Sequence, residues 1–125
     1  RRMARLDNYL RRHRRRTGIT QKQVAWVLDL DTESQVSRHE RFERQPGLER
    51  ALGYAALYRA SVRKLFAGVY ERVETRTLRR VWLLAVRLGK RPPSRARDWK
   101  LNWIKGHCPR PTKTGKSRRG GERED

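Results

Sequence analysis

Apolar residues recur at intervals of three and four along most of the chain, the spacing of one face of an α-helix. No segment shows the alternation typical of a strand, so the pattern predicts an all-α protein. The predicted helices cover residues 6–16, 20–28, 32–41, 46–58 and 61–66, and the last pattern continues to about residue 90. The positions expected on inner faces are Leu6, Tyr9, Leu10, Val24, Ala25, Val27, Leu28, Val36, His39, Glu40, Leu48, Ala51, Leu52, Ala55, Tyr58, Leu65 and Phe66.

Two short helices are marked by their first residues. The segments beginning at Thr20 and Thr32 each have the form of a capping box, with Gln23 and Gln35 at the third helical position. A short turn, Asp29-Leu30-Asp31, separates them. Two capped helices joined by a tight turn are the outline of a helix-turn-helix.

These residues resemble the Cro and phage-repressor type (xenobiotic-response-element class) of helix-turn-helix regulators. The resemblance covers roughly residues 6–66. It implies a five-helix repressor-like domain over residues 1–66, followed by a helical extension and a disordered basic tail. The matching residues are Leu10, Arg14, Gly18, Ile19, Thr20, Gln21, Val24, Ala25, Leu28, Val36, Ser37, Arg38, Glu40, Pro46, Leu48 and Ser61 to Phe66.

In this family the second helix of the motif lies in the DNA major groove. The resemblance therefore implies that base edges are read by Ser34, Gln35, Ser37, Arg38 and Arg41. It implies that DNA phosphates are bound by Thr20, Gln21, Arg44 and Arg15. It further implies a structural ion pair between Arg14 and Glu40, which holds two helices in register.

Several of these residues also have a simpler interpretation. Gln35 can serve only to close its capping box, Ser37 can be merely exposed, and Arg38 and Arg41 can be solvated charges in an arginine-rich chain. The chain also departs from the family. One additional residue lies within 31–34, His39 and His13 replace apolar positions, and Arg41-Phe42 stands where Asn-Gly is common.

The charge supports a polyanionic partner. The chain has 125 residues with 33 basic and 13 acidic side chains, a formal net charge of +20. Of the basic residues, 26 are Arg, whose planar guanidinium binds phosphate through two hydrogen bonds. Eight of these lie near the N-terminus, and we expect part of this cluster to line phosphates: Arg1, Arg2, Arg5, Arg11, Arg12, Arg14, Arg15 and Arg16.

The apolar spacing of residues 67–90 predicts a helical extension with an apolar stripe. This stripe either folds back on the domain or pairs with a second subunit, and we favour the dimer. Residues 91–125 predict a basic tail with a short helix at 98–105, where Trp99 and Trp103 either pack on the body or recognise a partner. From Gly106 onward the composition predicts disorder.

The residue inventory offers no enzyme site. Cys108 is the single cysteine, the three histidines are dispersed, and no glycine-rich phosphate loop occurs, so we expect no catalytic residue, metal or cofactor. No apolar run is long enough to cross a membrane, and we expect a cytoplasmic protein. The predicted function is sequence-specific binding of double-stranded DNA by a homodimeric transcriptional regulator, a repressor acting by operator occupancy. The alternatives are an antitoxin that binds its toxin through residues 67–125, and an RNA-binding or ribosome-associated protein.

Overall fold

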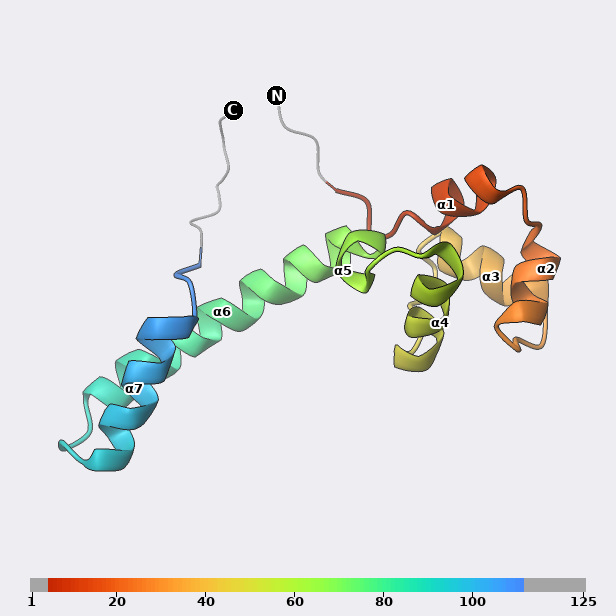
Figure 1. The fold of residues 1–125 in the computed structure, drawn as a ribbon. Coiled ribbons are helices and arrows are strands. Elements are labelled where there is room, and N and C mark those ends of the chain that lie inside the picture. Colours follow the sequence, from red (N-terminus) through yellow and green to blue (C-terminus); the bar gives the residue numbers. More distant parts are fainter. Residues whose placement is uncertain (1–4, 112–125) are drawn as a thin grey trace, which may run out of the picture. The chain divides into compact units, whose positions relative to one another are not determined.

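The computed structural model describes residues 5–111, and within this range the chain forms seven α-helices and no strand (Figure 1). The expectation of an all-α protein is confirmed. The helices are α1 (Leu10–Thr17), α2 (Gln21–Val27), α3 (Glu33–Glu40), α4 (Leu48–Tyr58), α5 (Val62–Leu65), α6 (Ala67–Gly89) and α7 (Arg95–His107).

The helix starts follow the capping residues read from the sequence. At α2, the Thr20 hydroxyl oxygen accepts the Gln23 N–H at 3.1 Å, and the Gln23 Oε1 atom accepts the Thr20 N–H at 3.0 Å. The helix before it ends at Gly18, whose φ of 79° is a left-handed conformation that glycine adopts without strain. Local side-chain chemistry therefore sets the ends of these short helices.

Packing divides the described residues into two units. One comprises residues 5–70, here called the N-terminal unit, and the other comprises residues 71–111, here called the C-terminal hairpin. The division falls inside α6, four residues after the boundary expected at residue 66.

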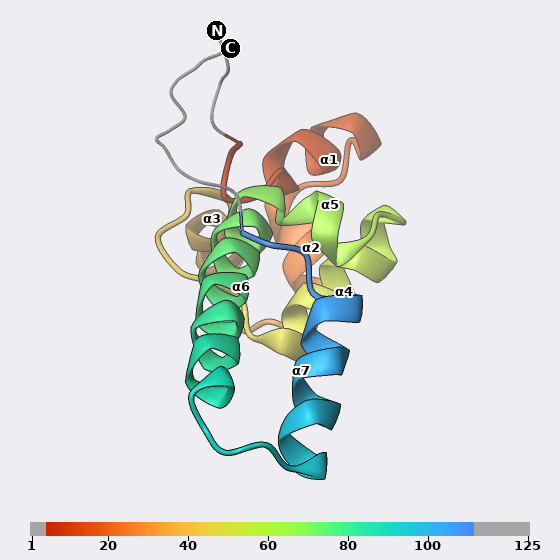
Figure 2. The same ribbon diagram turned by 90° about the vertical axis from the view of Figure 1, so that its left-hand side faces the viewer.

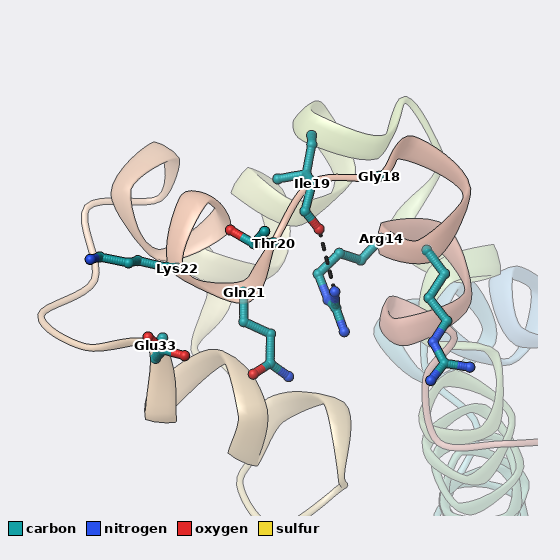
Figure 3. Close-up of a pocket in the computed structure, with 8 residues that line it drawn as sticks. Arg14, Gly18, Ile19, Thr20, Gln21, Lys22 and Glu33 are labelled. Atoms are coloured by element: carbon teal, nitrogen blue, oxygen red, sulfur yellow. Dashed lines mark hydrogen bonds between the residues drawn. The ribbon is translucent and has the colours of Figure 1, made fainter.

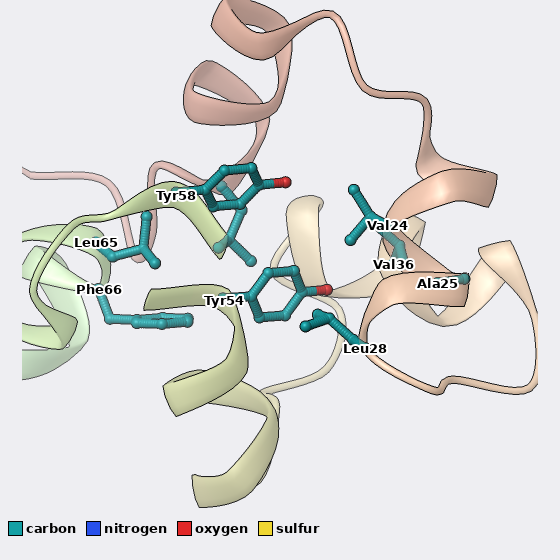
Figure 4. Packing of buried hydrophobic residues seen from close by; sticks show 9 residues of the cluster. Val24, Ala25, Leu28, Val36, Tyr54, Tyr58, Leu65 and Phe66 are labelled. Atoms are coloured by element: carbon teal, nitrogen blue, oxygen red, sulfur yellow. The ribbon is translucent and has the colours of Figure 1, made fainter. Parts of the chain in front are cut away.

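A single core holds the N-terminal unit together (Figure 4). Its largest fully buried side chains come from five different helices: Leu10, Val24, Val36, Tyr54 and Leu65. Burying such side chains contributes about 1.5–3 kcal/mol each relative to leaving them exposed. Each of the five helices α1 to α5 is thus anchored to the same core.

Some apolar positions expected inside are exposed. Leu48 and Leu52 are 75% and 52% exposed, whereas the expected inner residue Tyr58 is buried together with Tyr54, which was not expected inside. Two tyrosines four residues apart bury more apolar surface than the two leucines on another face of the helix, and this decides its rotation. Val27 is about half exposed for a similar reason, because α2 packs through Val24, Ala25 and Leu28.

The first helix begins at Leu10 and not at Leu6 as expected. The Asn8 side chain accepts the Leu10 N–H at 3.1 Å, and the Tyr9 N–H donates to the Leu65 carbonyl at 2.8 Å. The Gly68 N–H donates to the Leu6 carbonyl at 2.9 Å, and a side chain at Gly68 would collide with that carbonyl. Long-range backbone bonds therefore hold residues 6–9 outside the helix.

The C-terminal hairpin is formed by α6 and α7, which run antiparallel (Figure 2). They pack through Ala85, Leu88 and Ile104. The helix α7 extends beyond the predicted 98–105 at both ends, so residues 91–111 are not simply a tail. The apolar stripe of α6, expected to form a dimer, is thus partly covered by the same chain.

Order also continues past Gly106, where disorder was expected to begin. The indole N–H of Trp82 donates to the Pro109 carbonyl at 3.1 Å, and the Arg110 guanidinium lies 3.9 Å from the centroid of the Trp82 ring. Pro109 and Arg110 are therefore held against α6. The rest of the predicted disordered tail, residues 112–125, lies outside the described residues.

Candidate nucleic-acid interface

The two capped helices α2 and α3 pack closely against each other, joined by residues 28–32. Asp29 has a φ of 56° at the turn, and the Leu30 N–H donates to the Ala25 carbonyl at 2.8 Å. The side chain of Arg50, on α4, donates to the Asp29 carbonyl at 3.3 Å. The turn is thus fixed from both α2 and α4.

Three helices meet at the carboxylate of Glu40, whose side chain is 2% exposed. Arg14 binds it through two hydrogen bonds, from Nε at 2.7 Å and from Nη2 at 3.2 Å. The Gln21 amide donates to the same carboxylate at 3.0 Å. The hydrogen bond to Glu40 raises the pKa of Arg14 above its ordinary value. This network ties α1, α2 and α3 into one arrangement.

A second buried polar contact fixes α3 from another side. The His39 ring nitrogen Nδ1 lies 2.8 Å from the Tyr54 hydroxyl, and the Asn8 side chain donates to the His39 carbonyl at 2.9 Å. Burial lowers the pKa of His39, and the nearby Arg44 and Arg50 lower it further. Burial in the fold therefore disfavours the charged form of the His39 ring.

With Val36, His39 and Glu40 buried, α3 turns its other side outward. Ser34, Arg38 and Arg41 are exposed, whereas Gln35 and Ser37 are partly buried. All five predicted base-reading residues thus lie away from the buried stripe of one helix. Their side chains can reach a ligand that approaches this face.

Four of these five residues take part in side-chain contacts within the chain, and the Ser34 hydroxyl lies 3.0 Å from the Thr32 hydroxyl. The Gln35 Oε1 atom accepts the Asp31 N–H at 2.9 Å and the Thr32 N–H at 3.3 Å, so the capping role is present. The Gln35 amide NH2 is not used in these bonds and keeps its donor capacity. Arg41 donates to the Ser37 hydroxyl at 3.1 Å and forms an ion pair with Glu43 at 3.0 Å.

An open hollow of about 500 Å³ lies beside α3, between the end of α1 and the start of α2 (Figure 3). Three of the four predicted phosphate-binding residues line it, namely Arg15, Thr20 and Gln21. Arg44 does not line it and lies in the loop after α3, where its N–H donates to the Arg38 carbonyl at 3.4 Å. The predicted phosphate ligands therefore fall into two groups, one at this hollow and one in the loop that follows α3.

Two further residues line the hollow that the sequence interpretation did not assign. Lys22 adds a cation, and Glu33 adds an acidic group at the first position of α3. Lys22 could have been found because it follows Gln21 in the first turn of a helix. Neither of the predicted ligands Thr20 and Gln21 is fully available, since Thr20 caps α2 and Gln21 binds Glu40.

Other kinds of site are not indicated in the part of the chain that the structure describes. Residues 5–111 contain no group of three His, Cys, Asp or Glu side chains that could hold a metal ion. No helix in the same range is long and apolar enough to span a bilayer. Of the N-terminal arginine cluster, Arg1 and Arg2 lie outside the described residues.

Comparison with models of known protein families gave no match to this chain, and comparisons with curated proteins and with solved structures gave no significant match either. The functional interpretation therefore depends on the geometry of α1 to α4 and on the residues that this geometry exposes.

Proposed function

We propose that this protein binds double-stranded DNA sequence-specifically through α3 and regulates transcription by occupying an operator. The observation that carries the proposal is the opposition of two sides of α3. One side is anchored by Val36, His39 and Glu40, and the other presents Ser34, Arg38 and Arg41. A rigid helix with polar side chains outward is what direct readout in the major groove requires.

The resemblance to Cro and phage-repressor regulators supports the same proposal. In those proteins the helix preceding the recognition helix contacts the DNA backbone, and here α2 begins at the hollow lined by Arg15, Gln21 and Lys22. The proposal includes a homodimer that reads two half-sites about 34 Å apart, no cofactor, and a cytoplasmic location. The net charge of +20 would add sequence-independent attraction to the duplex.

The test begins with selection of bound fragments from a random duplex library. Two pairs of variants then separate base contacts from backbone contacts. Arg38→Ala removes a candidate base contact, and Gln35→Glu keeps the oxygen that caps α3 while removing the amide donor. Each is expected to relax the preference at one base position, by about 1–3 kcal/mol or roughly 5- to 150-fold.

Arg15→Ala and Lys22→Ala are the backbone variants, and Arg79→Ala in the C-terminal hairpin is the control for loss of one charge. The backbone variants are expected to weaken binding equally for all sequences and to lower the salt dependence. Failure to enrich any sequence, or equal losses on all sequences for all four variants, would refute base reading by α3. Stronger binding of structured RNA than of duplex DNA would favour the RNA-binding alternative.

A protein partner for the C-terminal hairpin is a second candidate function, as expected for an antitoxin. It is favoured by the exposure of two indole rings on α7, since Trp99 is 80% and Trp103 is 52% exposed. Light scattering of the purified chain would separate the two interpretations of this surface. A dimer that Trp103→Ser dissociates supports self-association, and a monomer that forms a stable complex with the neighbouring gene product supports the antitoxin.

A further inference from the structure

Four arginines lie on the outer side of α1. The inner side is occupied by Leu10, which is fully buried, and by Arg14, which is bound to Glu40. Helical spacing places the four arginines on the remaining circumference, and all are exposed. This outer arginine surface consists of Arg11, Arg12, Arg15 and Arg16.

The four side chains also share a hollow. Together with Leu6 they line an open depression of about 570 Å³. The Arg12 guanidinium lies 5.0 Å from the centroid of the Tyr9 ring, a cation–π contact that orients it. Leu6 adds an apolar side chain to the lining, and each arginine carries an apolar stem below its charged guanidinium group.

This arrangement is electrostatically unfavourable for the free protein. Arg11 and Arg15 are four residues apart, as are Arg12 and Arg16, and like charges at this spacing destabilise a helix by about 0.2–0.5 kcal/mol per pair. The first turn of α1 contains no acidic residue. A ligand that supplies several negative charges along a line would relieve this repulsion, and a phosphodiester backbone does so.

The outer arginine surface is continuous with the proposed DNA interface. Arg15 lines both the hollow on α1 and the hollow between α1 and α2. A duplex whose bases face α3 and whose backbone passes Lys22 and Arg15 is thereby led toward Arg11 and Arg16. The surface is therefore placed to meet phosphates beyond the base pairs that α3 can reach.

We infer that the outer arginine surface of α1 is a second phosphate-binding site, which holds the backbone of duplex DNA flanking the segment read by α3. The inference rests on the proposed function, because it assigns the flanking backbone of that same duplex. It enlarges the contact with DNA without adding any base contact, so its effect is on affinity and salt dependence and not on sequence preference.

The experiment uses the full chain with a selected duplex extended by about ten base pairs, one helical turn, on each side. Phosphate-ethylation interference is mapped for the wild type and for the triple variant Arg11→Gln/Arg12→Gln/Arg16→Gln, which spares the shared Arg15. The matched control is Arg76→Gln/Arg79→Gln/Arg80→Gln, which removes three charges from an exposed part of α6. The thermal transition of each variant shows that it is folded.

For the wild type we expect interfering phosphates outside the base-contacted segment. The α1 triple variant is expected to lose these outer positions alone. The slope of log K against log salt is expected to fall by about 2–3 in magnitude, at about 0.9 for each phosphate that is no longer neutralised. The α6 variant is expected to retain the outer positions. Sequence preference is expected to be the same in all three proteins.

The inference is overturned if the wild type shows no outer interference, or if the two triple variants behave alike. In either case a shared preference among selected sequences would leave base reading by α3 standing. If no duplex is selected at all, the proposed function itself fails. If the α1 variant loses affinity for structured RNA and not for duplex DNA, the surface serves another polyanion and the assignment to duplex DNA is wrong.

Discussion

The N-terminal unit and the C-terminal hairpin are both helical and basic, but they differ in the number and size of their buried side chains. In the N-terminal unit five large side chains are less than 2% exposed, and the buried polar groups Glu40 and His39 have partners. In the hairpin the buried side chains are Ala85, Leu88 and Ile104. Large apolar side chains are exposed in both regions, Trp26 and Leu48 in the N-terminal unit and Trp99 and Trp103 in the hairpin.

This difference shows what each region can specify by itself. Five helices that share one core and several buried hydrogen bonds determine one position for α3. Two helices that share a few apolar contacts leave large apolar side chains in water, and small units of this kind gain little free energy from burial. The N-terminal unit therefore holds α3 in a fixed position, whereas the hairpin has fewer buried contacts to hold its two helices together.

The largest difference in the free energy of unfolding is expected between two leucine-to-alanine substitutions, one in each region. Leu10→Ala opens a cavity in the fully buried core and is expected to lower the free energy of unfolding by about 2–5 kcal/mol. Leu88→Ala, in the hairpin, is expected to change the unfolding of the N-terminal unit by less than about 1 kcal/mol while amide exchange in α7 becomes faster.

Urea denaturation and residue-resolved hydrogen exchange measure the two effects. A loss of several kcal/mol in the main transition from Leu88→Ala would show that the hairpin and the N-terminal unit unfold as one cooperative body, and the two regions would then not differ in stability.

A difference of intermediate size is expected in how much two arginine–carboxylate pairs contribute to the free energy of unfolding. Arg14→Ala leaves the buried Glu40 carboxylate with Gln21 alone and is expected to lower the free energy of unfolding by about 3 kcal/mol. Arg97→Ala breaks a pair with Asp98 in α7, whose side chain is 57% exposed, together with a hydrogen bond to the Arg91 carbonyl. The expected loss from the ion pair is within about 1 kcal/mol.

Thermal denaturation of both variants at low and high salt gives the comparison. The effect of Arg14→Ala is expected to persist at about 1 M salt, because the Glu40 side chain is shielded from solvent. If both variants lose the same stability, burial of the Glu40 carboxylate does not make its pair with Arg14 more stabilising than the pair of Arg97 with Asp98.

The smallest expected effect is a pH dependence carried by His39. Burial lowers its pKa in the folded protein below the ordinary value of 6.5, so the unfolded chain takes up a proton at a higher pH than the folded one does. Stability is then complete above about pH 6.5 and falls as the pH drops through and below that value, by no more than about 1.4 kcal/mol per pH unit.

Melting curves between about pH 5 and pH 8 would detect this, with His39→Gln as the matched variant. The substitution is expected to lower stability at neutral pH and to remove most of the slope on the acid side of the ordinary histidine pKa. An unchanged slope in His39→Gln would assign the pH dependence to another group.

Expectations based on local chemistry agree with the structure more closely than those based on packing. The capping boxes place the starts of α2 and α3, because Thr20 and Gln35 bond to backbone groups within four residues. In α4 the pattern was wrong about Leu48 and Leu52, which are exposed, whereas Ala51, Ala55 and Tyr58 lie at the core as expected. Spacing alone cannot choose between two apolar faces of one helix, and the face that carries Tyr54 also makes the contact with His39 on α3.

The candidate site shows the same division. The sequence indicated which residues lie on the outer side of α3, since the buried stripe of Val36, His39 and Glu40 determines the opposite side. It could not indicate that Gln21 binds Glu40, or that Arg15 lines two hollows, because these contacts join residues from different helices.

Composition and near neighbours along the chain are sufficient to establish that the protein is helical, where α2 and α3 begin, and that the chain is strongly basic. Only the tertiary structure shows that residues 6–9 stay outside α1 and that α7 folds back on α6. It also shows which arginines are bound within the fold and which are exposed. Those outcomes depend on contacts between residues distant in sequence, whose free energies outweigh local helix preference.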